Sequence, residues 1–231
     1  MNFKKTMLCA VLAASFIPLS AEADPYQIAI TGLVDFNVIT GDLTGVKQGD
    51  PVSLSFSVDS SNFLNSASFP TRGYVIDPSS FVLHIGSAAI TMPSAGAPTY
   101  FVLRNNDPRV DGFFISAGVD DVFPFAVVDT GGAILNQMDL KHTFNGSNGH
   151  PFDPTFSSLN IADAAGSYNL TQNVSAFLWG LGVNGTHGTE IVPTSMTITA
   201  AVPEPDSYAL MLAGLSVIGF MARRQKTAGK A

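Results

Sequence analysis

The sequence predicts an all-β domain, an antiparallel β-sandwich or jelly roll, over residues 24–201. Residues 52–58 alternate without a fault between apolar and hydroxyl side chains, as a half-buried strand does. Further short apolar runs follow along the chain, and clusters of Gly, Pro, Asn and Asp that favour turns separate them. The region contains no amphipathic pattern of three helical turns. Many short strands joined by turns are typical of packed antiparallel sheets.

Eight runs are expected to be strands, because each is apolar or alternating and is bounded by residues that favour turns. In chain order they are 27–30, 52–58, 81–85, 100–103, 112–116, 123–128, 176–179 and 195–200. A turn is expected at Asp77-Pro78 and another at 105–108. The polar stretch 136–154 is expected to be a surface loop or an edge excursion.

The N-terminus has the pattern of a secretory signal peptide over residues 1–23. Two lysines precede an apolar run, 7–19, that is too short to span a bilayer, and an A-x-A cleavage site ends at Ala23. We expect signal peptidase to cut after Ala23. The single cysteine, Cys9, lies inside this peptide, so the exported chain is expected to contain no disulfide.

The charge balance excludes some partners. The chain has a formal net charge of -7 and a pI near 4.8. Between residues 24 and 202 there are fifteen acidic side chains and five basic ones, a net charge of -10. A chain without an excess of Lys and Arg is a poor partner for nucleic acid or for an anionic membrane surface. We therefore expect no nucleic acid among its partners.

The C-terminus is expected to contain a single transmembrane helix. Pro203 and Pro205 prevent helix formation immediately before the apolar run 207–222. These sixteen residues span about 24 Å as a helix, and long terminal side chains can extend that reach to the membrane surfaces. Arg223 and Arg224 follow the apolar run and are expected to remain on the cytoplasmic side of the membrane. This orientation places the preceding domain on the outer side of the membrane.

The combination of Val-Pro-Glu-Pro, an apolar helix rich in Ala, Gly and Leu, and a terminal Arg-Arg pair resembles the PEP-CTERM sorting signal over residues 202–226. The resemblance implies an exported protein of a Gram-negative bacterium, held in the inner membrane as a precursor. It also implies an exosortase-like membrane protease that processes the protein for the cell surface or extracellular matrix.

Carried over to this chain, the resemblance makes Pro203, Glu204 and Pro205 the recognition motif. It makes Arg223 and Arg224 the membrane stop. A Pro-x-Pro segment is extended and rigid, which is a form of backbone that a protease can bind. An ordinary membrane anchor that is not cut is the alternative interpretation of the same tail.

A calcium site is one hypothesis for the loops of the central domain. Asp107 and Asp111 lie close together in a stretch rich in Asp and Asn, and carboxylate and carbonyl oxygens are the ligands that Ca²⁺ prefers. The stretch has no EF-hand order, so turn capping is the alternative. No other cofactor is expected.

Two further patterns have a functional and a structural interpretation. Residues 180–185 fit G-x-G-x-x-G, but no helix can open at these glycines, so a hairpin or a glycine-rich loop is expected instead of a dinucleotide site. Trp179 is a candidate for stacking on a sugar ring, with a place in the core as the alternative.

The sequence favours a non-enzymatic exported protein that an exosortase sorts to the cell envelope or matrix. It contains no G-x-S-x-G elbow, and the exported chain has no cysteine nucleophile. The first alternative is a lectin-like carbohydrate-binding module, with or without calcium, whose partner is extracellular polysaccharide. The second is a polysaccharide hydrolase, which needs two carboxylates paired in space.

Overall fold

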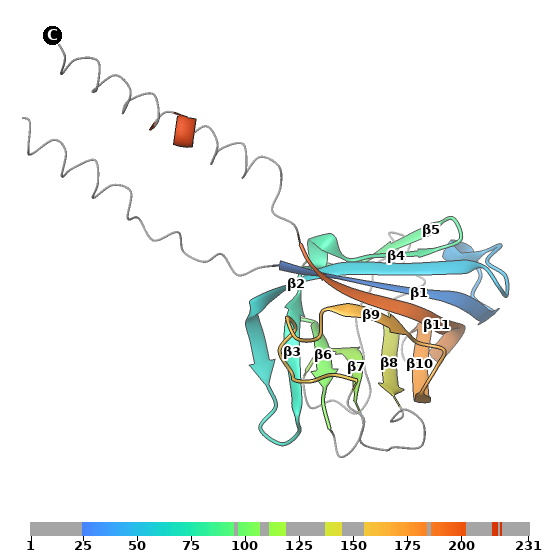
Figure 1. Cartoon of the computed structure of the whole chain (residues 1–231). Coiled ribbons are helices and arrows are strands. Elements are labelled where there is room, and N and C mark those ends of the chain that lie inside the picture. The colour runs from blue at the N-terminus through green and yellow to red at the C-terminus, as the bar shows by residue number, and fades with distance from the viewer. Residues whose placement is uncertain are drawn as a thin grey trace, which may run out of the picture. The chain divides into compact units, whose positions relative to one another are not determined.

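The computed structural model describes residues 25–94, 97–106, 111–118, 137–144, 155–183, 186–201, 214–216 and 218. Its described residues up to Ala200 form eleven β-strands and two short 3-10 helices (Figure 1). The all-β prediction is therefore confirmed. Seven of the eight expected strands overlap observed ones, and the run 123–128 lies outside the described residues.

The elements follow one another in this order along the chain. They are β1 (Pro25–Asn37), η1 (Gly41–Leu43), β2 (Pro51–Asn65), β3 (Thr71–Ile76), η2 (Pro78–Ser80), β4 (Val82–Ile85), β5 (Ala88–Thr91), β6 (Tyr100–Arg104), β7 (Gly112–Ser116), β8 (Gln137–Phe144), β9 (Gly166–Asn169), β10 (Val174–Val183) and β11 (Thr186–Ala200). The expected turn at Asp77-Pro78 is the start of η2, where the Asp77 carboxylate accepts a hydrogen bond from the Ser79 amide.

Eight strands close into an antiparallel barrel. Their order is β1-β11-β10-β8-β7-β6-β3-β2, and β2 pairs back with β1. The strands β4 and β5 extend from β2, and β9 pairs with β11. The predicted antiparallel arrangement is confirmed, but the two sheets of the expected sandwich are one continuous closed sheet.

The long strands β2 and β11 are the reason that the sheet closes. The first half of β2 pairs with β1 and β4, and an irregularity between Val58 and Phe63 redirects the second half to β3. The strand β11 pairs with β1 along most of its length, with β10 near its start and with β9 near its end. In Figure 1 these long strands run across the top, above the differently directed β3, β6, β7, β8 and β10.

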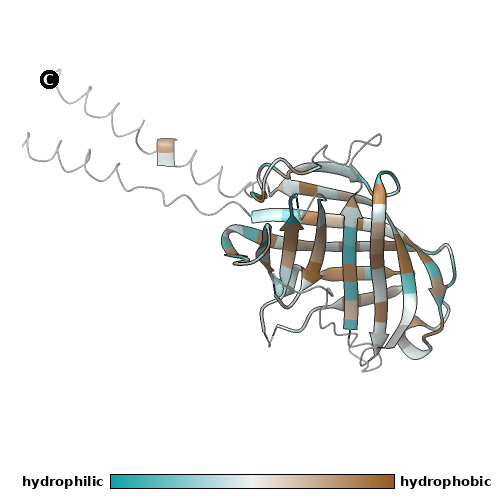
Figure 2. Cartoon of the chain, turned by 90° about the horizontal axis from the view of Figure 1, so that it is seen from below, coloured by the Kyte–Doolittle hydropathy of each residue, from teal (hydrophilic) through white to brown (hydrophobic). Residues whose placement is uncertain are grey.

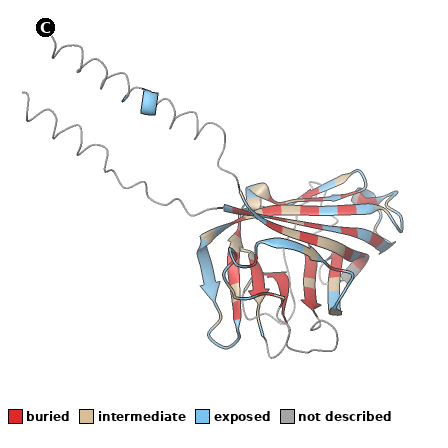
Figure 3. Cartoon of the chain, in the orientation of Figure 1, coloured by how far each residue is buried: buried red, intermediate tan, exposed pale blue. Residues whose placement is uncertain are grey.

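The interior of the barrel is filled by apolar side chains from alternate strand positions. Phe56, Phe101 and Phe113 are each at most 1 % exposed, with neighbouring ring centroids 5.5 and 5.8 Å apart. Figure 2 shows the matching alternation of hydropathy, and Figure 3 shows buried and exposed residues alternating along the upper strands. The alternation at 52–58 therefore gave the correct face of β2.

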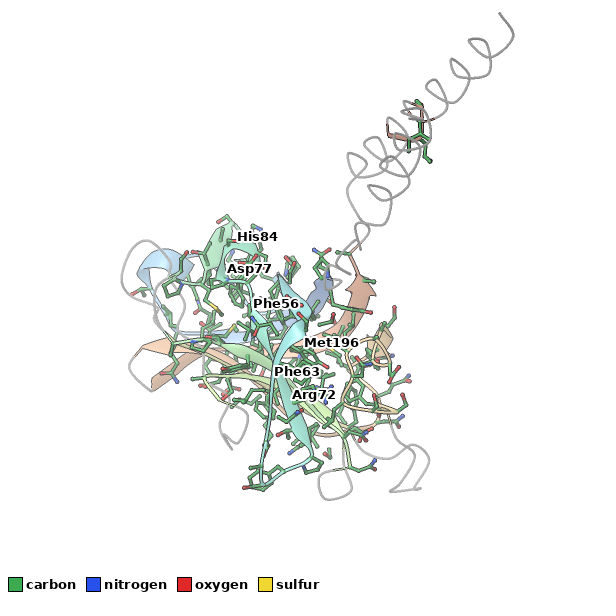
Figure 4. All side chains as sticks on the ribbon, turned by 90° about the vertical axis from the view of Figure 1, so that its left-hand side faces the viewer. Phe56, Phe63, Arg72, Asp77, His84 and Met196 are labelled. Atoms are coloured by element: carbon green, nitrogen blue, oxygen red, sulfur yellow. The ribbon has the colours of Figure 1, made fainter. Side chains whose placement is uncertain are left out.

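The β2–β3 hairpin extends apolar side chains away from this core. Phe63 and Leu64 are 41 % and 48 % exposed. The Arg72 guanidinium carbon lies 4.2 Å above the Phe63 ring, and these two side chains lie next to each other in Figure 4. Arg72 Nε also donates a hydrogen bond to Asn65 Oδ1 at 2.7 Å, which fixes the guanidinium over the ring.

The polar stretch 136–154 is not simply a loop, because it contains the interior strand β8. This strand pairs with β7 on one edge and with β10 on the other. All of its residues except Lys141 are buried, including Gln137 and Asp139, which hydrogen-bond to each other at 3.0 Å. The expectation of a loop is wrong here, because polar side chains on one side of the strand conceal the apolar side in the sequence.

The C-terminal segment 201–231 is a separate compact unit from residues 1–200. Of the expected transmembrane span 207–222, the structure describes residues 214–216 and 218, which are helical. Among the described residues, none of the helices is both long enough and apolar enough to cross a membrane. Most of the predicted transmembrane span 207–222 lies outside the described residues.

Candidate functional site

Asp111 joins three segments of the chain at the start of β7. It is 5 % exposed. Its Oδ1 accepts a hydrogen bond from the Asn106 amide at 2.9 Å, and its Oδ2 accepts one from the Phe156 amide at 2.7 Å. Its main-chain carbonyl accepts a third, from the Phe144 amide at 2.9 Å. A buried carboxylate bonded in this way holds the backbone together.

The structure gives Asp111 a different role from the predicted calcium ligand. Both of its carboxylate oxygens already accept backbone hydrogen bonds. Within the described ranges, no three His, Cys, Asp or Glu side chains gather in a group that could hold a metal ion. Asp107, the other predicted ligand, lies outside the described residues. The capping alternative is the one that fits Asp111.

The predicted stacking of Trp179 on a sugar is wrong. Trp179 lies on β10, is 1 % exposed and belongs to the hydrophobic core. It pairs across the sheet with Leu140 of β8. Its ring faces are therefore covered by the protein, as the core alternative predicted. Trp179 Nε1 has no hydrogen-bond partner among the described residues.

The glycine pattern 180–185 lies where two strands meet, as expected. The strands β10 and β11 pair with Val183 opposite Thr186, which leaves two residues, Asn-Gly, between them. An Asn-Gly pair between antiparallel strands is a typical hairpin connection. The pattern therefore lies at the junction of two antiparallel strands, as a β-hairpin requires.

His142 is a buried histidine on β8. It is 1 % exposed, and neither ring nitrogen has a hydrogen-bond partner in the described part of the chain. Its ring packs against both Phe113 and Phe144, at centroid distances of 5.5 and 4.7 Å. Desolvation lowers the pKa of His142 to about 4, so the imidazole is neutral near pH 7.

The opposite side of β8 from the core carries buried polar groups. Arg104 Nη2 donates a hydrogen bond to Thr143 Oγ1 at 2.7 Å. Desolvation, and then the nearby positive charge of Arg104, lower the pKa of Lys141 from its usual value. The polar pattern of this strand therefore reflects paired groups within the fold.

A shallow groove lies along β9 and β11. Its volume is about 620 Å³, within the range of roughly 300–1,000 Å³ that small-molecule sites occupy. Six of its eight lining residues have hydroxyl or amide side chains, although apolar atoms make up most of its exposed area. These six are Ser167, Asn169, Thr171, Thr194, Ser195 and Thr197. Tyr168 and Met196 complete the lining. No local sequence pattern predicts this groove, because its residues come from two strands and their flanking turns.

The groove continues into a broad outward-facing surface that we call the hydroxyl face. It consists of two cross-strand rows over β5, β4, β2, β1, β11 and β9. The first row is Ala89, His84, Ser53, Thr31, Ser195 and Asn169. The second row is Thr91, Val82, Ser55, Ala29, Thr197 and Ser167. All twelve are exposed or half-buried, and none is Asp, Glu, Lys or Arg.

The predicted sorting motif begins shortly after the last strand. The strand β11 ends at Ala200, so Pro203 is the third residue beyond it. Pro203, Glu204 and Pro205 lie outside the described residues, as do Arg223 and Arg224. The barrel and the tail together define an all-β protein with a C-terminal sorting signal.

Comparison with known families assigns that signal. The model of the PEP-CTERM protein-sorting motif matches residues 201–225. The chain thus carries a PEP-CTERM sorting motif, as the resemblance implied. The motif identifies it as an exported protein of Gram-negative bacteria that is processed at the membrane by an exosortase. Neither the comparison with curated proteins nor that with solved structures gives a match.

Proposed function

We propose that this chain is a non-enzymatic protein of the cell envelope or extracellular matrix, released there by cleavage of its sorting tail. The observation that carries the proposal is the sorting motif over residues 201–225, directly after the last strand of a closed domain. Signal peptidase removes residues 1–23 during export, and an exosortase then acts on the tail.

The barrel supports a binding or structural role. Its interior is occupied by a continuous cluster of buried apolar side chains. The buried carboxylate of Asp111 holds backbone amides, and Trp179 packs in the core. Other molecules are therefore expected to bind to the outer surface of the barrel, which consists of loops and of the outward-facing strand positions.

Replacing Pro203 and Pro205 together with alanine tests the sorting proposal. The substitution removes the rigid extended segment that a protease would recognise and leaves the following apolar run unchanged. In the native host, we expect the variant to accumulate as an uncut precursor in the membrane fraction. Intact-mass determination of each cell fraction measures this directly.

Asp206→Ala is the matched control, because it changes a neighbouring residue outside the Pro-Glu-Pro motif. The control is expected to be cut at the same bond as the unmodified chain and to give a mature protein that starts at Asp24. Release of the double proline variant at the normal rate, with cleavage at the same bond, would contradict the role of the motif.

A further inference from the structure

The groove along β9 and β11 has the chemistry of a site for a neutral ligand. Its lining contains no charged side chain. The adjoining hydroxyl face contains no Asp, Glu, Lys or Arg side chain either, although the domain carries a net charge of -10. A charged ligand would lose its hydration here without gaining an ion pair, which is unfavourable. The acidic domain also repels polyanions at long range.

The hydroxyls at the groove are ordered before any ligand binds. Thr31 Oγ1 lies 2.8 Å from Thr194 Oγ1 and 2.7 Å from Ser195 Oγ, within hydrogen-bond distance of both. Each hydroxyl offers one donor and two acceptor positions, so this network retains capacity for further hydrogen bonds. A ligand with many hydroxyl groups can replace the bound water with equivalent hydrogen bonds.

Tyr168 holds β9 against the core beneath the groove. Its hydroxyl donates a hydrogen bond to the Ala164 carbonyl at 2.6 Å. Its ring packs against Phe156 and Phe144, at centroid distances of 5.3 and 6.2 Å. Side chains alternate along a strand, so its neighbours Ser167 and Asn169 point to the outer face of the sheet. Tyr168 therefore fixes the position of the strand whose hydroxyl and amide side chains line the groove.

We propose that this groove binds a neutral polysaccharide chain, with the hydroxyl face as its continuation. The row Ser53, Thr31, Ser195 and Asn169 crosses four paired strands. Adjacent strands lie about 4.8 Å apart, so the row extends for about 14 Å. This length accommodates consecutive sugar units of an extended chain. The sorting tail places the protein outside the cell and takes no part in the binding.

The test uses the full chain in a detergent without a sugar headgroup. The probes are the neutral tetrasaccharides cellotetraose, mannotetraose and maltotetraose, with alginate as an anionic polymer for comparison. Titration followed by calorimetry and by amide chemical shifts is expected to show binding of at least one neutral probe. The shifts are expected at Ser167 and Thr197, whose side chains line the groove.

The variant pair Ser167→Ala and Thr197→Val removes two hydroxyls from the lining and keeps residues suited to strands. We expect this double variant to bind at least tenfold more weakly with an unchanged Tm. Thr44→Val with Ser87→Ala is the matched control, because both residues are exposed hydroxyls outside the groove. The control is expected to keep the original affinity.

Three results would overturn the proposal. The first is that no neutral probe binds at about 10 mM, on the order of the weakest specific affinities. The second is that the double variant binds as tightly as the unmodified chain. The third is that alginate binds more tightly than the neutral probes. If the Tm of the double variant is lower than that of the unmodified chain, the single variant Ser167→Arg is used in its place. This exposed position tolerates a long side chain. None of these results bears on tail processing, which the Pro203 and Pro205 variant tests separately.

Discussion

The neutral imidazole of His142 makes the stability of the barrel depend on pH. The folded state holds the pKa of His142 at about 4, whereas an exposed histidine titrates near 6.5. The unfolded chain therefore binds a proton first as the pH falls. Stability is expected to be lost progressively from pH 6.5 to pH 4, by about 3 kcal/mol from this group. Urea unfolding at several pH values measures the effect.

The variant His142→Phe isolates that contribution, because a phenyl ring can pack against Phe113 and Phe144 and cannot titrate. The difference in unfolding free energy between the variant and the unmodified chain is expected to grow as the pH falls from 7 to 4. His84→Phe is the control, since His84 is an exposed histidine on β4 (labelled in Figure 4). A constant difference for His142→Phe across this range would refute the assignment.

Single residues show where sequence reasoning stops. Asp111 has the residue type and surroundings of a calcium ligand in one dimension, but it bonds the amides of Asn106 and Phe156, the latter 45 positions away. Trp179 lies in an apolar run that fits either a binding strand or a core strand. The structure shows that it is a core strand, because Trp179 is buried and pairs with Leu140 of β8. This pairing cannot be seen in the sequence.

At the scale of elements, the Tyr74 hydroxyl connects β3 to the segment before β9. Tyr74 is fully buried, donates a hydrogen bond to the Leu159 carbonyl at 2.7 Å and accepts one from the Ile161 amide at 2.9 Å. Tyr74→Phe leaves both backbone groups without this partner. We expect a loss of about 1–3 kcal/mol and faster hydrogen exchange of the Ile161 amide.

Tyr100→Phe serves as the control for this variant, because the Tyr100 hydroxyl has no hydrogen bond within the part of the chain that is described. It is expected to change the unfolding free energy by less than about 0.5 kcal/mol. An equal loss in both variants would show that the two bonds of Tyr74 do not hold the segment.

Elements with strong patterns could be predicted from the sequence, and the others could not. The alternation in β2 and the apolar run 112–116 of β7 were both correctly predicted to be strands. The strand β8 was missed, because Asp139 and Lys141 occur in a strand that is buried on both sides. The four-residue strand β9 was missed as well, since its stability comes from pairing with β11.

At the scale of the whole molecule, a closed barrel with one core is expected to unfold in a single cooperative transition. Gly32 tests this at the β1–β11 pair. A Cβ at this position would lie 2.7 Å from Ile191 Cγ2, 2.8 Å from the Val192 carbonyl oxygen and 2.9 Å from Trp179 Cζ3. Gly32→Ala is expected to cost about 1–3 kcal/mol, because the neighbouring backbone cannot move away freely.

Trp179 is the single tryptophan, so its fluorescence reports on the core. In Gly32→Ala, the fluorescence transition and the far-UV circular dichroism transition are expected to shift to the same lower temperature. Gly166→Ala is the control, because its nearest contact would be an ordinary 3.8 Å to Tyr168. Two separated transitions in Gly32→Ala would show that the barrel is not one cooperative unit.

The sequence predicts strands better than it predicts how a sheet closes. Alternation shows which face of β2 is buried, but the same pattern serves a sandwich and a barrel. Closure depends on the change of partner along β2 near Val58 and on the pairing of β1 with β11. The binding groove is equally hidden, because β9 reaches β11 only in the folded chain.

The pairing of the first strand with the last has a consequence for the order of events during export. The strand β1 acquires β2 as a neighbour early, but its other edge must wait for β11, with Tyr26 opposite Ala200. An unpaired strand edge is a template for association with other chains. We therefore expect the exposed edge of β1 to favour association between chains until the fifteen residues of β11 are available to pair with it.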